Sequence, residues 1–119
     1  DKNAVDIIGP DPCDVGGIAE LKWIAEFADL YGVLVAPHGV GNGIIGTAAL
    51  VQMCATLPKN YIAFEMPIIQ PLWWDLVEGL PRPLVKDGFI EVPDRPGMSV
   101  ELNEKAVRKH LPEGDDFFG

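Results

Sequence analysis

The chain has 119 residues, of which 48% are hydrophobic and 23% are charged, values typical of one globular domain. Nine Lys and Arg residues against 18 Asp and Glu residues give a net charge of −9, which argues against a nucleic-acid surface because such surfaces need a basic patch. No apolar run reaches the roughly 18 residues of a membrane span and no signal peptide opens the chain, so we expect a cytoplasmic protein without a membrane partner.

Three short strands alternate with two helices over the first 65 residues. The strands are predicted from apolar runs at Ala4–Ile8, Val33–Pro37 and Tyr61–Phe64. The helices are predicted to begin after Gly16–Gly17 and to cover Ile44–Leu57. Because right-handed crossovers through helices make successive strands parallel, this order predicts a β-α-β-α-β unit with a parallel sheet.

The two predicted helices differ in how their apolar residues are distributed. The first has one apolar face and a glycine, Gly32, in position to end it in a left-handed conformation. The residues of this face are Ile18, Leu21, Ala25, Ala28 and Tyr31. The second helix is apolar nearly all round and is stopped by Pro58, so we expect it to be covered on more than one side.

An ionisable side chain follows each predicted strand: Asp11, His38 and Glu65, at regular intervals of 27 residues. The carboxyl ends of parallel strands meet at one edge of a sheet, where α/β proteins place their chemistry. The three residues are therefore candidates for one catalytic site. For His38 alone, the alternative is a histidine that caps a strand and bonds to the backbone.

The glycine-rich segment after the second strand supports a competing interpretation. Gly41–Gly46 reads G-x-G-x-x-G and opens a helix, and Glu65 follows 24 residues after Gly41, as in the dinucleotide-binding fingerprint. In that fingerprint the first glycine follows the strand directly, whereas Pro37–Val40 intervene here. The other interpretation is a loop that lets a helix begin close to an anionic ligand.

The two cysteines, Cys13 and Cys54, have neither a CxxC spacing nor a partner histidine at a metal-ligand spacing. The sequence therefore indicates neither a disulfide nor a zinc site. We expect two buried free thiols in a reducing compartment.

The alternation of strands and helices ends after Glu65. An aromatic segment at Pro71–Trp74 is expected to serve packing, and two prolines after it mark a loop. The elements predicted next are a strand at Gly88–Val92, a turn at Pro93–Gly97, a strand at Ser99–Leu102 and a helix over Glu104–Leu111 that Asn103 caps. This order predicts a C-terminal β-hairpin followed by a helix.

Several of these features form one larger pattern. Asp11 is followed by Gly16–Gly17, then by Ala36-Pro37-His38, then by the strand-end Glu65, and the segment Asp87–Glu101 adds a C-terminal motif. Together they resemble the last third of the barrel in the mandelate racemase and muconate lactonizing enzyme group of the enolase superfamily. The tryptophans at 73 and 74 look more like those of the sugar-acid dehydratases of this group than those of the racemases.

The resemblance implies a partial TIM-type (β/α) barrel within the α/β class. The chain would supply about three parallel βα units, the last strands of the barrel, followed by the C-terminal hairpin and helix. Residues 1–70 would form these units, and residues 71–119 would pack on the barrel or on the capping region.

The resemblance also implies roles for the three strand-end residues. His38 would be the general base, oriented by Asp11, and would remove the proton α to a carboxylate or protonate a leaving hydroxyl group. Glu65 would hydrogen-bond the substrate carboxylate as the enediolate forms. Such a dianionic intermediate needs strong electrostatic help, and a histidine held by a carboxylate has a fixed tautomer and a raised basicity.

The chain departs from the group in one respect. The resemblance implies Mg²⁺ held by carboxylates on strands that this chain does not contain, so we expect no metal ligands here. A TIM barrel needs about 250 residues, and three strands leave two open edges. We therefore expect a homo-oligomer or a missing N-terminal barrel part.

Four functions stay open on the sequence. The first is the C-terminal portion of a magnesium-dependent sugar-acid dehydratase, acting on a small carboxylate substrate. The second is a racemase, epimerase or cycloisomerase of the same group. The others are a non-catalytic fragment or interaction module, and a nucleotide-binding α/β domain.

Overall fold

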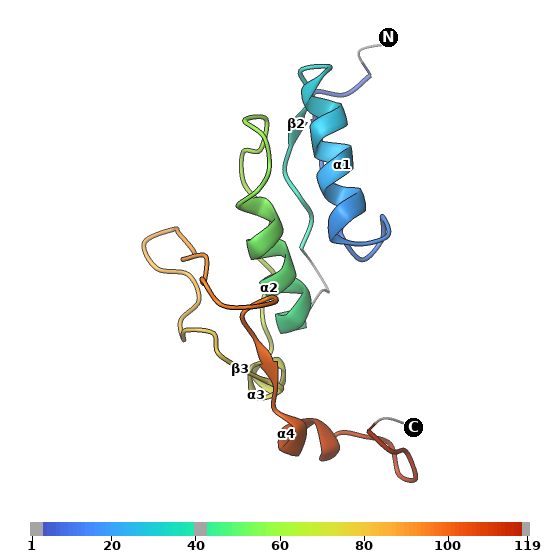
Figure 1. Ribbon diagram of the computed structural model, residues 1–119, viewed down its shortest axis with the longest axis vertical. Helices are drawn as coiled ribbons and strands as arrows, with labels where there is room; N and C mark the ends of the chain where they lie inside the picture. The colour runs from blue at the N-terminus through green and yellow to red at the C-terminus, as the bar shows by residue number, and fades with distance from the viewer. Residues whose placement is uncertain (1–3, 40–42, 118–119) are drawn as a thin grey trace.

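The computed structural model of the chain describes residues 4–39 and 43–117, which form an elongated molecule. Its extents are 53 × 33 × 25 Å and its radius of gyration is 16.2 Å, against about 13.5 Å for a compact domain of this length. The elements are β1 (Ile7–Ile8), α1 (Ile18–Asp29), β2 (Leu34–Val35), α2 (Gly43–Cys54), α3 (Pro71–Asp75), β3 (Val77–Glu78), β4 (Glu101–Leu102) and α4 (Glu104–Arg108). Figure 1 shows α2 in the middle, with α1 and β2 on one side and α3, β3 and α4 toward the other end.

Strands β1 and β2 pair in parallel, as the sequence predicts, although the regular part of each is only two residues long. Ile8 lies opposite Val35 in this pair. Backbone hydrogen bonds continue past the strands: the amide of Ala36 donates to the carbonyl of Ile8 (2.9 Å), and the amide of His38 donates to the carbonyl of Pro10 (3.0 Å). The two strand ends are therefore held side by side up to His38.

The third predicted strand, Tyr61–Phe64, runs parallel on the other side of β2. It forms a single bridge, between Val35 and Tyr61, so the prediction of a regular strand is wrong while its parallel direction is confirmed. Further along, the amide of Glu65 donates to the carbonyl of Pro37 (3.0 Å). This bond aligns the end of the third segment with the end of β2.

Helix α1 begins directly after Gly17 and packs one face inward, as predicted. The buried residues of this face are Leu21, Ala25 and Ala28. Ile18 and Tyr31, which the periodicity assigned to the same face, are 43% and 62% exposed, because Ile18 is the first residue of the helix and Tyr31 lies beyond its last residue, Asp29. Gly32 has φ 68°, the left-handed conformation predicted for the residue that ends the helix.

Helix α2 is covered on more than one side, which confirms the interpretation of its apolar surface. Its buried residues are Ile44, Thr47, Ala48, Leu50, Val51, Met53 and Cys54. The side-chain amide of Gln52 donates to the carbonyl of Pro93 (2.8 Å) and to the hydroxyl of Ser99 (3.3 Å). These bonds attach the C-terminal segment to α2.

The core consists of two clusters that share Leu57. One joins α1 and α2 through Leu21, Leu50, Met53 and Cys54, and the other joins α1 and β2 through Ala25, Ala28 and Val35. Burial of such aliphatic side chains stabilises a fold by about 1.5–3 kcal/mol each. These contacts keep α1, α2 and the strand ends in fixed positions relative to one another.

The C-terminal part departs from the predicted hairpin. Strand β4 lies within the predicted Ser99–Leu102 strand, but its antiparallel partner is β3, which the sequence did not predict. The predicted strand at Gly88–Val92 does not form, and Lys86 and Phe89 make one isolated bridge around a tight turn instead. The hairpin prediction was wrong because the true partner of β4 lies more than 20 residues earlier in the chain.

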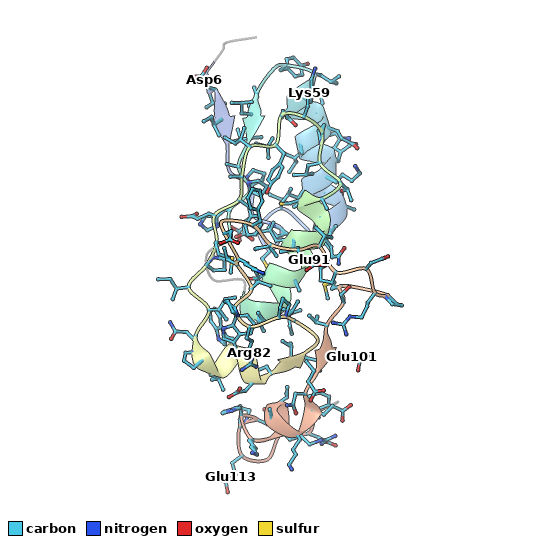
Figure 2. All side chains as sticks on the ribbon, turned by 90° about the vertical axis from the view of Figure 1, so that its left-hand side faces the viewer. Asp6, Lys59, Arg82, Glu91, Glu101 and Glu113 are labelled. Carbon is cyan, nitrogen blue, oxygen red and sulfur yellow. The ribbon has the colours of Figure 1, made fainter. Side chains whose placement is uncertain are left out.

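The aromatic segment forms the short helix α3, with Pro71 at its first turn, a position that proline favours. The guanidinium of Arg82 lies over the ring of Trp74 at 5.1 Å, donates to the Trp74 carbonyl and pairs with Asp75 at 3.6 Å. Figure 2 shows Arg82 beside α3. The packing role expected of this segment agrees with these contacts.

Helix α4 is capped as predicted, because the side chain of Asn103 accepts a hydrogen bond from the amide of Ala106 (3.1 Å). The helix ends at Arg108, three residues before the predicted end. Its last turn carries Lys105 and Arg108, whose positive charges interact favourably with the negative end of the helix dipole.

Large apolar side chains remain exposed on the outer side of α1. Trp23 is 59% exposed and Phe27 is 48% exposed, and their rings stack with centroids 5.6 Å apart. Among the described residues, no helix has the length and apolar character needed to cross a membrane.

Candidate active site

Asp11, His38 and Glu65 come together at the carboxyl ends of three parallel segments. The backbone bonds from His38 to Pro10 and from Glu65 to Pro37 hold these ends level. The structure thus places all three predicted site residues in one cluster, with the histidine between the two acids.

Asp11 and His38 form a close, directional pair. Nδ1 of His38 lies 2.8 Å from Oδ2 of Asp11, and Oδ1 of Asp11 accepts from the amide of Cys13 at 2.8 Å. The Asp11 side chain is only 6% exposed. An ionised carboxylate can only accept hydrogen bonds, so this arrangement assigns the donated proton to Nδ1 and leaves the lone pair on Nε2.

Glu65 lies on the opposite side of the imidazole ring. Its Oε2 atom is 3.5 Å from Nε2 of His38, and its side chain is 61% exposed. The separation suits an ion pair once His38 is protonated, and it exceeds the usual length of a direct hydrogen bond. Nε2 and the Glu65 carboxyl group therefore face the same exposed region.

The environment of His38 raises its pKa above the ordinary value of 6.5. The hydrogen bond to Asp11 is the largest cause, and the negative charges of Glu65, Asp11 and Asp14 add to it, whereas partial burial of the ring acts in the opposite direction. A general base works best with a pKa near the operating pH. The site therefore holds a half-exposed imidazole whose raised pKa makes it a stronger proton acceptor than an ordinary histidine.

The described residues do not supply a magnesium site. Magnesium prefers several oxygen ligands in octahedral geometry, and residues 4–39 and 43–117 contain no group of three or more His, Cys, Asp or Glu side chains placed to hold a metal ion. Asp11 and Glu65 approach different nitrogens of His38 and do not converge on a common point. Any metal chemistry at this site requires ligands other than the described ones.

Sequence reasoning missed the backbone contribution to the site. The amide of Cys13 fixes one oxygen of Asp11, and the signal for it was the Asp-Pro-Cys order, in which an aspartate bonds the amide two residues on. Cys13 itself is exposed while Cys54 is buried, so the expectation of two buried thiols was wrong for Cys13. It lies within the turn over residues 12–16 that directly follows Asp11.

The competing glycine motif lies partly outside the described residues. Gly41 and Asn42 lie outside the described residues, and Gly43 begins α2. Glu65, which the dinucleotide fingerprint would place on a ribose, instead faces the imidazole of His38.

Known proteins are similar in sequence to this chain over nearly its whole length. Residues 1–106 match the family described as "Enolase C-terminal domain-like". A D-xylonate dehydratase of Haloferax volcanii is 43% identical over 116 residues, which are 97% of this chain and 27% of that enzyme. A D-galactarolactone cycloisomerase of Agrobacterium fabrum is 36% identical over 112 residues, which are 87% of this chain and 29% of that enzyme.

Solved structures show the same fold. A mandelate racemase/muconate lactonizing enzyme-like protein from Rubrobacter xylanophilus superposes with a TM-score of 0.79 and 37% identity, covering 98% of this chain and 29% of that chain. An enolase from Pantoea ananatis with bound D-gluconate and Mg superposes with a TM-score of 0.74 and 30% identity, covering 92% of this chain and 26% of that chain. The chain thus spans less than a third of the length of the relatives it matches.

Proposed function

The chain belongs to the enolase C-terminal domain-like family of the enolase superfamily, and from this premise we propose that it is the C-terminal, proton-transferring portion of a sugar-acid dehydratase. In this proposal residues 1–70 are the last βα units of a TIM-type barrel, and residues 71–119 pack on that barrel. The 43% identity to a D-xylonate dehydratase favours dehydration and a sugar acid as substrate.

The observation that carries the proposal is the position of His38 between two acids. Asp11 holds Nδ1 at 2.8 Å and Glu65 lies 3.5 Å from Nε2. Nε2 accepts the proton α to the substrate carboxylate, and the electron pair of the broken C–H bond enters the enediolate. The β-hydroxyl group then leaves with a proton from the imidazolium as water, and the resulting enol becomes a 2-keto-3-deoxy acid.

Each acid has a separate task in this mechanism. Asp11 is a positioning residue that keeps the Nε2 lone pair available and stabilises the imidazolium. Glu65 needs a proton on its carboxyl group for this task, and it then donates a hydrogen bond to the substrate carboxylate while negative charge accumulates there. A magnesium ion, when bound, would stabilise the same charge, and we assign its ligands to residues outside the described chain because those within it do not fit.

A cycloisomerase is the second candidate, supported by the 36% identity to the A. fabrum enzyme. The same base would abstract the α-proton, but no water would be lost. Product analysis separates the two reactions, since only dehydration yields a 2-keto-3-deoxy acid.

The proposal is tested by grafting this chain into the H. volcanii dehydratase in place of the segment it matches. We expect the graft to convert D-xylonate to a 2-keto-3-deoxy acid, and His38→Gln to reduce turnover by about 100-fold or more, as loss of a general base does. His110→Gln, which changes the other histidine of the chain in its exposed C-terminal region, is the matched control. A folded graft whose turnover survives His38→Gln contradicts the proposal.

A further inference from the structure

We infer that Gly39 is a positioning residue: it lets the backbone of Glu65 pack against it, and this contact directs the Glu65 carboxyl group toward His38. The inference deepens the proposed function, because it names a further residue on which that site depends. It stands on the packing around Gly39, which is buried immediately after His38 in the chain.

The space beside Gly39 is closed by the backbone of Glu65. A Cβ atom built on Gly39 would lie 2.3 Å from the carbonyl oxygen of Glu65, 3.3 Å from Cδ2 of Leu50 and 3.4 Å from Cδ of Pro67. Carbon and oxygen atoms that are not bonded do not approach to 2.3 Å, and a densely packed interior gives way little. Any side chain at position 39 must therefore displace the Glu65 segment or the end of β2.

The glycine serves this close approach and not an unusual backbone conformation. The chain has eight described glycines with φ in the left-handed region, and Gly39 is not among them. An L-residue could adopt its backbone angles, so the steric contact with Glu65 is the reason that a glycine is required here.

The position of the Glu65 carboxyl group depends on how the backbone of Glu65 is held. Its amide is fixed by the 3.0 Å bond to the Pro37 carbonyl, and its carbonyl lies against Gly39. Among the described residues, the recorded ion pairs and hydrogen bonds give the Glu65 side chain one partner, His38. Because no other ion pair or side-chain hydrogen bond is seen for Glu65 among the described residues, we attribute the position of its carboxyl group to the backbone, which is held on both sides.

The test is the titration of His38 followed by NMR in the 119-residue chain, with His110 as an internal reference. Glu65 raises the pKa of His38, after the larger effect of the Asp11 hydrogen bond. We therefore expect Gly39→Ala to lower the His38 midpoint in the same direction as Glu65→Gln. We also expect no further decrease when the two substitutions are combined, since both act through one carboxyl group.

Gly9→Ala is the matched control. Gly9 also lies at a strand end without a left-handed φ, but its Cβ would meet the nearest atom, the carbonyl oxygen of Ala36, at 3.1 Å, which a small shift relieves. We expect the His38 midpoint to stay at the wild-type value in this variant. A folded Gly39→Ala protein with the wild-type midpoint overturns the inference, and so does full additivity with Glu65→Gln.

A second variant covers the case in which Gly39→Ala does not fold. Glu65→Asp shortens an exposed side chain by one methylene and leaves the packing around Gly39 intact. If the backbone of residue 65 is fixed as inferred, the shorter side chain cannot keep its carboxyl group close to Nε2 of His38. The titration midpoint of His38 then falls, as it does in Glu65→Gln. An unchanged midpoint shows a mobile backbone and overturns the inference. Because no substrate is used, these outcomes are independent of whether the dehydratase proposal holds.

Discussion

The carboxylate of Asp11 and the imidazole of His38 lie 2.8 Å apart although 27 residues separate them in the chain. Asp11 follows β1 and His38 follows β2, and the parallel pairing of these strands brings them together. The pair links the fold to the chemistry, because any change that separates the strand ends also changes the protonation of His38.

The first prediction concerns stability against pH. The pKa of His38 is raised in the folded chain, first by the Asp11 hydrogen bond, so its protonated form favours folding. This contribution is fully present below the unfolded pKa of about 6.5 and is lost as the pH rises through the folded pKa. We expect the urea midpoint of the wild type, relative to that of His38→Gln, to fall between pH 6 and pH 9. A constant difference over this range contradicts the prediction.

The second prediction concerns Asp11→Asn. An asparagine can turn its NH₂ group toward Nδ1, which favours the tautomer with the proton on Nε2 and removes the base. In the grafted dehydratase we expect turnover to fall by about 100-fold or more, together with a lower titration midpoint of His38. Asp14→Asn removes the charge with the smallest effect on the pKa of His38 and is expected to change both quantities far less. Equal changes in turnover and in the His38 midpoint for the two variants would contradict the prediction, because they would show that any lost negative charge near His38 has the same effect.

The periodic part of the fold was predictable from sequence. Short apolar runs, the spacing of Leu21, Ala25 and Ala28, and Gly32 as a helix end are local signals, and each has its counterpart in the structure. The placement of Asp11 and His38 at one edge of the sheet also follows from sequence, because parallel crossovers bring strand ends together, whereas their direct contact is seen in the structure alone.

The C-terminal part was not predictable in the same way. The alternation over Gly88–Val92 looks like a strand, but a strand needs a partner over several residues, and the bridge given for this segment is the isolated one between Phe89 and Lys86. Strand β3 has two residues, Val77 and Glu78, and carries no periodic signal of its own. Its pairing with β4 is a long-range contact, which a local pattern does not encode.

The third prediction concerns the buried Asn60, which joins α1 to β2. Its side-chain NH₂ group donates to the carbonyls of Ala25 (3.0 Å) and Val33 (2.9 Å), and the residue is 4% exposed. We expect Asn60→Ala to lower the free energy of unfolding by about 2 kcal/mol or more, because a buried carbonyl left unpaired costs about 1–3 kcal/mol. Lys59→Ala, at the exposed neighbouring position, is the control and should change stability by less than about 0.5 kcal/mol. Urea unfolding measures both, and equal losses would contradict the prediction.

The fourth prediction concerns the two thiols. Burial raises the pKa of Cys54 to about 11, whereas Cys13 is exposed, and the thiolate is the reactive form. We expect iodoacetamide at pH 8 to modify Cys13 in the native chain and to reach Cys54 only in denaturant, as peptide mapping can show. The pKa of Cys13 is also raised, by desolvation and then by the charges of Asp11 and Asp14, so Asp14→Asn should accelerate its modification. Labelling of both thiols at similar native rates would show that α2 is not packed as described.

The fifth prediction concerns association of the isolated chain. Trp23 and Phe27 of α1 and Tyr31, just past its end, form a contiguous aromatic row, with neighbouring ring centroids 5.6 Å and 5.2 Å apart, and each is about half exposed or more. Apolar surface of this kind favours contact with another apolar surface. We propose that copies of the chain associate through this row when no other barrel part covers it. Sedimentation velocity at increasing concentration should show oligomers in the wild type and a shift toward monomer in Phe27→Glu. Lys105→Glu, on the distant helix α4, is the charge control, and a wild-type chain that stays monomeric at high concentration refutes the proposal.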